Sequence, residues 1–187
     1  MLLQKKINIQ KGVFLLSDPF LQDEYFGRSV ILLCNHNIEG SFGYIINKPL
    51  TININEAVAG FPKFDAKVYY GGPVESNTLH YLHTIEELEE KVEIEKGIYW
   101  SGNYDHLKEL IQLGKVEPNQ IKFLLGYAGW NVGQIEEEME EDSWIVAESN
   151  PDYIFNHRES SLWKDVLINM GGEFEKIAHY PLSPLLN

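Results

Sequence analysis

The sequence is poor in cysteine, with Cys34 the only one among 187 residues. A lone cysteine excludes the internal disulfide framework on which many small secreted proteins depend. The sequence also has no apolar run near the roughly 20 residues that a membrane-spanning helix needs. Its longest run, Val30 to Cys34, has the length of a buried strand, and the first residues lack the apolar core of a secretory signal. We therefore expect a cytoplasmic protein without a membrane span.

Basic residues are also scarce. Lysine and arginine total 15 against 28 aspartate and glutamate residues, which gives a formal charge of -13 and an isoelectric point near 4.8. Such a charge repels nucleic-acid phosphates and anionic lipid unless the basic residues gather on one face. None of the helices that we expect carries a basic stripe. The sequence therefore predicts no direct binding to DNA or to a membrane surface, and favours a small molecule or another protein as partner.

Apolar and aromatic residues are plentiful, at 44% and 12% of the chain. This composition is typical of an ordered globular protein, and no linker-like stretch divides it. Segments with strand and helix patterns alternate along the chain. We therefore expect residues 1–187 to form a single compact domain of the mixed α/β class.

The strongest strand signals are two apolar runs that a short turn joins. Val30 to Asn35 and Phe42 to Ile46 flank a polar turn, which predicts an antiparallel hairpin within residues 29–47. A third apolar run, Ile121 to Leu125, stops before Gly126. Because all three are apolar enough to be interior strands, we expect the hairpin to pack beside the third run.

Three pairs of residues are spaced as helix N-terminal caps, in which a polar side chain and one three residues later satisfy each other's backbone N–H groups. They are Asn53 with Glu56, Thr84 with Glu87, and Asn131 with Gln134. Each pair predicts the start of a short helix. The third helix, from Gln134 to Asp142, is strongly acidic and lies between Trp130 and Trp144.

Four blocks of sequence together resemble the bacterial AlgH/YqgE family. They are GVFLLSDPFLQDEYFGRSVILLCNHNIEGSFGYIINKPL, YYGGPV followed by LHYLH, FLLGYAGWNVGQIEEEM, and the tryptophan Trp144. The blocks keep the family's order and spacing over most of residues 12–148. The chain departs from the family pattern at Lys48, where arginine is common, at Ser41, where alanine is usual, and from Asp152 onward.

The resemblance implies an α/β fold with a split, mostly antiparallel sheet curled into a barrel-like core with flanking helices. It also implies a role as a transcriptional regulator of uncharacterised mechanism, without an established catalytic activity. Together with the acidic charge, it favours a non-enzymatic regulatory module that binds a ligand or a protein and acts on transcription indirectly. The alternative is an enzyme that acts on a small anionic metabolite in a cleft near Arg28 and the loop of residues 71–73.

Several polar or turn-forming residues fall at the ends of the expected strands, where a rigid scaffold displays functional groups. We expect these residues to line one ligand-binding cleft: Ser17, Arg28, His36, Asn47, Gly71, Gly72 and Pro73. Arg28 can bind an anionic ligand there, or it can form an internal ion pair with nearby Asp18, Asp23 or Glu24.

Other combinations favour ordinary structural roles. Cys34 and His36 share a strand face and would suit a nucleophile with its base, but Cys34 fits better as a buried apolar residue. His80 and His83 lie three apart on an expected strand and should point to opposite faces, which disfavours a metal site. No nucleotide-binding or serine-hydrolase motif is present. We therefore predict no catalytic residue, no metal and no cofactor.

The acidic helix offers one further candidate surface. Carboxylates can steer a basic partner while flanking aromatic side chains supply apolar anchors. The residues expected to bind such a partner are Trp130, Gln134, Glu138 and Trp144. The alternative is a solvent-facing helix surface with no partner. Tyr127 and Trp130 are suited to stack on a flat ligand, but aromatic residues at a glycine corner fit the core better.

Overall fold

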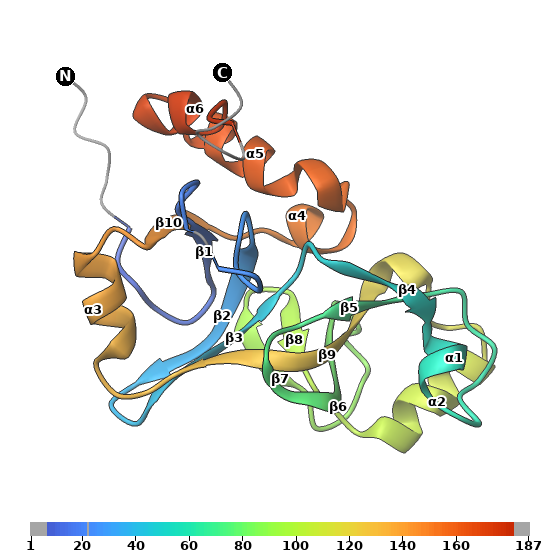
Figure 1. Cartoon of the computed structure of the whole chain (residues 1–187). Coiled ribbons are helices and arrows are strands. Elements are labelled where there is room, and N and C mark those ends of the chain that lie inside the picture. Colours follow the sequence, from blue (N-terminus) through green and yellow to red (C-terminus); the bar gives the residue numbers. More distant parts are fainter. Residues whose placement is uncertain (1–6, 22, 182–187) are drawn as a thin grey trace.

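A sheet in which one long strand joins two halves organises the protein (Figure 1). The computed structural model describes residues 7–21 and 23–181. The strands are β1 (Val13–Ser17), β2 (Val30–Asn37), β3 (Gly40–Ile45), β4 (Pro49–Asn53), β5 (Lys67–Tyr70), β6 (Val74–His83), β7 (Val92–Glu95), β8 (Ile98–Trp100), β9 (Ile121–Trp130) and β10 (Trp144–Glu148). The helices are α1 (Ile54–Ala57), α2 (Tyr104–Gln112), the 3₁₀ helix η1 (Pro118–Gln120), α3 (Gln134–Glu140), α4 (Pro151–Phe155), α5 (Glu159–Met170) and α6 (Glu173–Ile177).

The ten strands form one sheet of order β10-β1-β2-β3-β9-β6-β8-β7, and β4 and β5 branch from it at β9. All pairs are antiparallel except β5 with β9. Strands β10 and β7 end the order, and no pairing closes the sheet within the described residues. The expected barrel-like core is therefore wrong: the sheet is open, and the domain is of the mixed α/β class.

Strand β9 is twice the length that the sequence suggested. It continues through Gly126 to Trp130, and its two halves have different neighbours. The half from Ile121 to Leu125 lies between β5 and β6, while the half from Ala128 to Trp130 pairs with β3. The hairpin of β2 and β3 is confirmed, but it lies beside the second half of β9 rather than the first. Gly126, at φ 71°, lets the backbone continue between the halves.

Helices cover separate parts of this sheet, and each contributes to its own core cluster. Apolar side chains of α5, such as Trp163, pack with one cluster, those of α2, such as Leu110, with a second, and Ile135 of α3 with a third. Figure 1 shows α5 and α6 over one end of the sheet, α3 beside β10, and α1 and α2 at the far end of β9. The sheet is thus buried by short elements that occupy different places around it.

The capping patterns had three different outcomes. Asn53 and Glu56 form the expected reciprocal cap of α1. The helix expected after Thr84 is absent, and turns at residues 86–87 and 89–90 take its place. The N–H of Thr84 donates to Gln120 instead, and that of Ile85 donates to the ring of His83.

At α3, Gln134 does accept from the N–H of Asn131, at 2.9 Å. The N-cap is nevertheless Gly133, at φ 78°, rather than Asn131. Glycine adopts the left-handed backbone conformation at this cap without strain. Strand β7 and helix α6 were not predicted from the sequence.

Candidate functional site

The main candidate site is a pocket of about 640 Å³ at the junction of β3, β6, β8 and β9. Phe42 and Tyr44 enter it from alternate positions of β3, and Trp100 and Tyr127 enter from β8 and β9. Side chains two apart on a strand share a face, so β3 presents both rings to the same space. Its lining residues are Asn35, Asn37, Glu39, Gly40, Ser41, Phe42, Tyr44, Val74, His80, Trp100, Tyr127, Gly129, Trp130 and Asn131.

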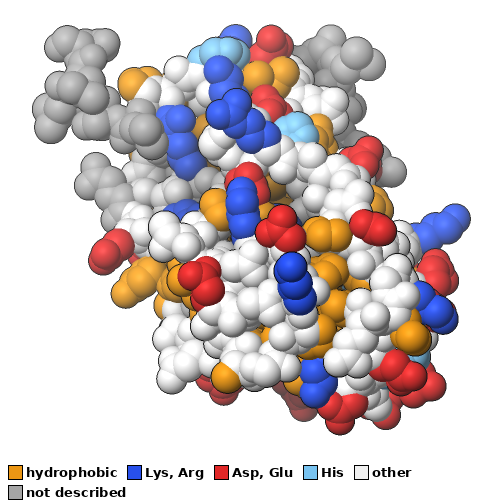
Figure 2. Space-filling view, turned by 90° about the vertical axis from the view of Figure 1, so that its right-hand side faces the viewer, with side chains coloured by type: hydrophobic (Ala, Val, Ile, Leu, Met, Phe, Trp, Pro, Cys, Tyr) orange, Lys and Arg blue, Asp and Glu red, His pale blue; other side chains and the backbone are white. Residues whose placement is uncertain are grey.

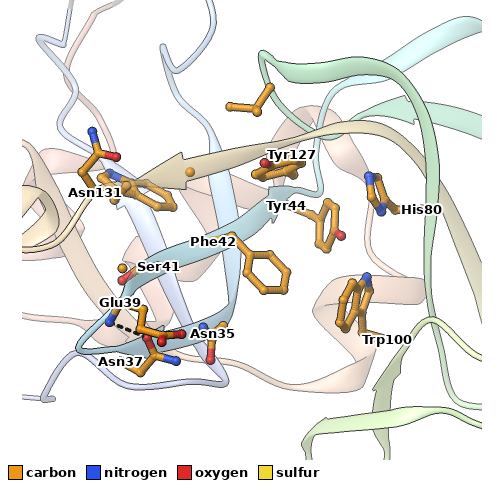
Figure 3. Close-up of a pocket in the computed structure, with 14 residues that line it drawn as sticks. Asn35, Asn37, Glu39, Ser41, Phe42, Tyr44, His80, Trp100, Tyr127 and Asn131 are labelled. Carbon is orange, nitrogen blue, oxygen red and sulfur yellow. Dashed lines mark hydrogen bonds between the residues drawn. The ribbon is translucent and has the colours of Figure 1, made fainter.

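The pocket has a polar end and an aromatic end (Figure 3). At the polar end lie Asn35, Asn37 and Glu39, around the turn between β2 and β3, where the N–H of Glu39 donates to Asn37 at 2.8 Å. At the aromatic end the rings of Tyr44 and His80 lie 5.2 Å apart between centroids. Such a gradient from polar to aromatic lining is typical of pockets that orient a small molecule.

The aromatic end contains polar atoms that lack partners. Nε2 of His80 and Nε1 of Trp100 are both buried and neither has a hydrogen bond of good geometry within the described residues, although the indole of Trp100 lies near enough to the hydroxyl of Tyr44 to lower its pKa. Figure 3 shows the hydroxyl of Tyr44 directed to the space between these two side chains. Buried polar atoms in native proteins nearly always have partners, so two unpartnered atoms in one pocket indicate a place for a bound polar group.

Burial keeps these groups in their neutral forms. It lowers the pKa of His80, although nearby Glu75 opposes the shift. It raises the pKa of Tyr44 well above the usual range, with the indole of Trp100 opposing the shift. At neutral pH the pocket therefore offers an uncharged imidazole, a phenol and an indole N–H. Such groups form hydrogen bonds but do not supply an activated nucleophile.

The residues expected to share a cleft are divided between two ends of β2. Ser17, Arg28 and Asn47 lie together at its start: Ser17 Oγ accepts from the N–H of Ser29 at 3.0 Å, and Asn47 donates to the carbonyl of Arg28 at 3.0 Å. His36 lies six residues beyond Val30, the first residue of the strand, which is about 20 Å at the usual rise per residue. It contacts Ser41 through Nδ1 at 2.8 Å and Glu136 at 3.7 Å. The structure does not bring these side chains into one cavity.

Arg28 does not form the internal ion pair considered for it. Its guanidinium lies 4.9 Å from the ring centre of Trp163, and Nη2 donates to the carbonyl of Tyr180. Asp18 and Asp23 accept hydrogen bonds from backbone N–H groups of their own turns instead. The ion-pair interpretation is wrong, since no carboxylate pairs with Arg28 in the part of the chain that is described.

The loop of Gly71, Gly72 and Pro73 has a structural role next to β9. The N–H of Gly71 donates to Leu125 at 2.8 Å, and its carbonyl accepts from Ile45 at 2.9 Å. Gly71 and Gly72 both lie against the backbone near Gly126. The loop therefore joins the hairpin to β9 through its backbone.

Cys34 and the two histidines of β6 have the expected placements. Cys34 is buried, and burial raises the pKa of its thiol far above the usual range, so it is not a nucleophile. His80 and His83 point to opposite faces of β6, as their spacing predicted. His83 is fully buried, with Nε2 donating to Ser101 at 2.7 Å and Nδ1 accepting from Ile85 at 3.1 Å.

The four residues proposed for a protein partner form an internal cluster. One oxygen of Glu138 accepts from the indole N–H of Trp130 at 2.8 Å and from that of Trp144 at 2.7 Å, and the other accepts from Gln134 at 2.9 Å. Both tryptophans are buried. The cluster fastens α3 to β9 and β10, and the indole rings are not free to anchor a partner.

Lys122 is a buried cation that we did not single out from the sequence. Its Nζ donates to the carbonyl of Ile46 at 3.0 Å and lies 3.7 Å from the ring centre of Tyr69. Burial lowers the pKa of Lys122 to about 8, although the nearby carboxylate of Glu159 opposes the shift. The sequence feature that could have indicated this buried cation is a lysine within the apolar run from Ile121 to Leu125.

The comparisons with known proteins agree over nearly the whole chain. The model of the AlgH-like family matches residues 14–175. The chain belongs to this family. A UPF0301 protein of Cytophaga hutchinsonii is 40% identical over 181 residues, covering 96% of this chain and 100% of the relative. One from Chlorobium luteolum is 41% identical over 177 residues, covering 94% of each chain.

Two solved structures have the same fold as this AlgH-like protein. The solution structure of the AlgH protein of Pseudomonas aeruginosa has a TM-score of 0.73 and 25% identity, with 95% of this chain and 97% of that one covered. The crystal structure of protein DIP2367 of Corynebacterium diphtheriae has a TM-score of 0.81 with 19% identity, covering 94% and 95%. At that identity the second likeness bears on the fold alone. No helix among the described residues is long and apolar enough to cross a membrane.

Proposed function

We propose that this protein is a non-enzymatic binding module whose ligand is a small, flat molecule without negative charge, held in the pocket between β3 and β9. The observation that carries the proposal is that Nε2 of His80 is buried without a partner at the aromatic end of that pocket, beside Nε1 of Trp100, which has no well-formed hydrogen bond within the described residues. Leaving a buried polar atom unpaired costs about 1–3 kcal/mol. A ligand that pairs with both atoms would recover much of that cost.

The lining also limits the charge of the ligand. Glu39 lines the pocket, and Glu75 is near enough to affect the pKa of His80 and Tyr44. None of the lining residues is lysine or arginine. A phosphate or carboxylate would therefore meet negative charge without a cation to pair with it. The aromatic rings of the lining instead favour stacking with a planar heterocycle or contact with an organic cation.

An enzyme acting on an anionic metabolite beside Arg28 and the loop of residues 71–73 has less support. The guanidinium of Arg28 lies over Trp163 and donates to the Tyr180 carbonyl, which leaves only its Nε without a partner in the described residues, and the loop is packed against β9. The thiol of Cys34 lies near Tyr44, but burial raises its pKa far above the usual range, so it is not held as a nucleophilic thiolate. These contacts support binding over catalysis.

Any effect on transcription would then be indirect. On the face shown in Figure 2, lysine and arginine side chains are separated by aspartate, glutamate and uncharged surface rather than joined in a continuous stripe. The formal charge of -13 adds a long-range repulsion of DNA. We expect no micromolar binding to labelled duplex DNA at low salt, measured by fluorescence anisotropy. Binding that weakens steeply as salt is added would contradict this.

A thermal-shift screen tests the proposed ligand class, because a ligand that binds the native state raises the melting temperature. The compounds should include neutral heterocycles, organic cations and phosphorylated metabolites. We expect hits among the first two groups, and expect Trp100→Phe, which keeps a ring but removes the N–H, to weaken binding. Tyr104→Phe, on α2 and outside the pocket, is the matched control. Hits confined to anions, or hits that Trp100→Phe leaves unchanged, would contradict the proposal, and turnover of a hit would show an enzyme.

A further inference from the structure

Strand β10 ends the sheet and leaves one of its edges open. The N–H of Asp18 donates to the carbonyl of Ser143 at 2.9 Å, in register with the β1–β10 ladder. In an antiparallel strand, the backbone N–H and C=O groups of every second residue form hydrogen bonds to the same neighbouring strand. The backbone groups of Ile145 and Ala147 therefore face β1. The backbone groups of Trp144, Val146 and Glu148 therefore point away from the sheet. No strand of the described chain pairs with this edge.

A groove of about 760 Å³ runs along this open edge. Met139 of α3 lines one side, and Met170 and Phe174 line the other. Its floor is β10, whose side chains alternate between these two sides. An exposed strand edge between apolar walls is the arrangement by which proteins add an extended peptide as a further strand, with the backbone supplying affinity and the walls supplying selectivity.

The charge of the groove indicates which peptide fits. Asp142 and Glu148 line it, and none of its lining residues is lysine or arginine. Helix α3, which contributes Met139 to the groove, also carries exposed carboxylates at Glu137 and Glu140. A second copy of this chain would bring its own formal charge of -13 to the contact. Electrostatics therefore favours a basic segment of another protein.

We propose that β10 binds an extended segment of a partner protein in which apolar side chains alternate with lysine or arginine. The outward groups from Trp144 to Glu148 span about 13 Å, which about five residues of an added strand would cover. The apolar side chains would enter the groove, and the basic ones would approach Asp142 and Glu148. This surface lies outside the pocket assigned to the small ligand, and the proposal does not depend on that ligand.

Fluorescence anisotropy with a labelled peptide of alternating lysine and valine tests the proposal. A second peptide of the same sequence, methylated at alternate backbone nitrogens, keeps the charge but cannot complete the ladder. We expect the methylated peptide to bind at least about tenfold more weakly, because strand addition depends on backbone hydrogen bonds. Equal binding of the two peptides would show attraction by charge alone and would overturn the proposal, as would no binding at about 1 mM.

Variants of the full chain locate the contact. Val146→Pro removes an outward N–H that β1 does not use, and proline is tolerated at such edge positions. We expect it to weaken binding of the unmethylated peptide at least about tenfold while the melting transition stays cooperative. Val146→Thr, which keeps the N–H, is the matched control. Asp142→Asn with Glu148→Gln should reduce the salt dependence of binding.

Two outcomes with these variants count against the proposal. If Val146→Pro binds the peptide as tightly as the unchanged protein, the peptide does not use the edge of β10. If sedimentation shows instead that the unchanged protein dimerises and that Val146→Pro abolishes the dimer, the edge serves a second copy of this chain. Either result would overturn assignment of the groove to a basic partner.

Discussion

Gly72 lies so close to Tyr127 that a Cβ atom at Gly72 would be 2.1 Å from the carbonyl carbon of Tyr127. Real Cβ atoms do not approach a backbone so closely, and Gly72 also has φ 152°, which side chains disfavour. The connection between β5 and β6 therefore packs directly against β9. Tyr127 is one of the rings of the proposed ligand pocket, so this contact fixes part of the pocket wall.

Substitution of Gly72 by alanine should destabilise the protein strongly. We expect the free energy of unfolding to fall by more than about 3 kcal/mol, from steric overlap and backbone strain together. Gly60→Ala is the matched control, because Gly60 also has a positive φ, 75°, but no atom within 4 Å of the added Cβ. Its loss should be about 1 kcal/mol, the cost of the backbone conformation alone. Urea unfolding measures both, and similar losses would contradict the packing argument.

Removal of the Glu138 carboxylate should loosen α3. In Glu138→Ala the buried indole N–H groups of Trp130 and Trp144 both lose their acceptor, which we expect to cost about 2–4 kcal/mol. The loss should appear in urea unfolding, with a change in tryptophan emission of the native state. Glu137→Ala is the control, since Glu137 is exposed on the same helix. A loss below about 0.5 kcal/mol in Glu138→Ala would show that water replaces the carboxylate.

His83 should make stability depend on pH in a defined range. Burial lowers the pKa of His83 from 6.5 to about 4 in the folded protein. Above pH 6.5 both states are neutral, and as the pH falls towards 4 the unfolded state gains a proton that the folded state does not. The protein should therefore lose roughly 3 kcal/mol of stability across that range.

His83→Gln tests this prediction by difference. The carboxyl groups titrate in both proteins, so the stability of the unchanged protein minus that of His83→Gln isolates the histidine. This difference should fall as the pH is lowered from 6.5 to 4. His179→Gln, at an exposed position, is the control and should keep the full pH dependence. A difference that does not vary with pH would mean that His83 is not held neutral.

Lys122 should also make stability rise with pH, but in the alkaline range. Its pKa is lowered from 10.5 to about 8, so as the pH rises above 8 the folded state releases a proton that the unfolded state keeps. Stability contributed by Lys122 therefore increases, by roughly 2 kcal/mol between pH 7.5 and 9.5. Lys122→Met should lack this increase, and Lys115→Met, at an exposed lysine, should keep it. Parallel profiles for the unchanged protein and Lys122→Met would contradict the pKa shift.

Local patterns predicted much of the sheet but not how its parts are joined. The apolar runs of β1, β2 and β3 were readable because both faces of these strands are buried. Strand β9 was cut short at Gly126, since a glycine in an apolar run indicates a turn as readily as an irregular strand. Thr84 failed as a cap because its N–H is used by Gln120 across the sheet, a contact that local sequence does not reveal.

The candidate site was less predictable for the same reason. Phe42 and Tyr44 can be placed on one face from their spacing, but His80, Trp100 and Tyr127 reach them from three other strands. Their proximity depends on the strand order, which no spacing along the chain contains. Conversely, Arg28 and His36 are close in sequence yet lie towards opposite ends of β2. The prediction of a shared cleft relied on short sequence separation. It failed because each residue of an extended strand adds about 3.3 Å to the distance.

The place of β9 in the chain has a consequence for protein synthesis. On the ribosome, β3, β5 and β6 are all translated before the strand that pairs with each of them. Until Trp130 has left the exit tunnel, these strands have exposed edges that could pair with neighbouring nascent chains. Productive folding is therefore delayed until more than two-thirds of the 187 residues have been made, and the emergence of β9 sets the moment at which the two halves of the sheet become one.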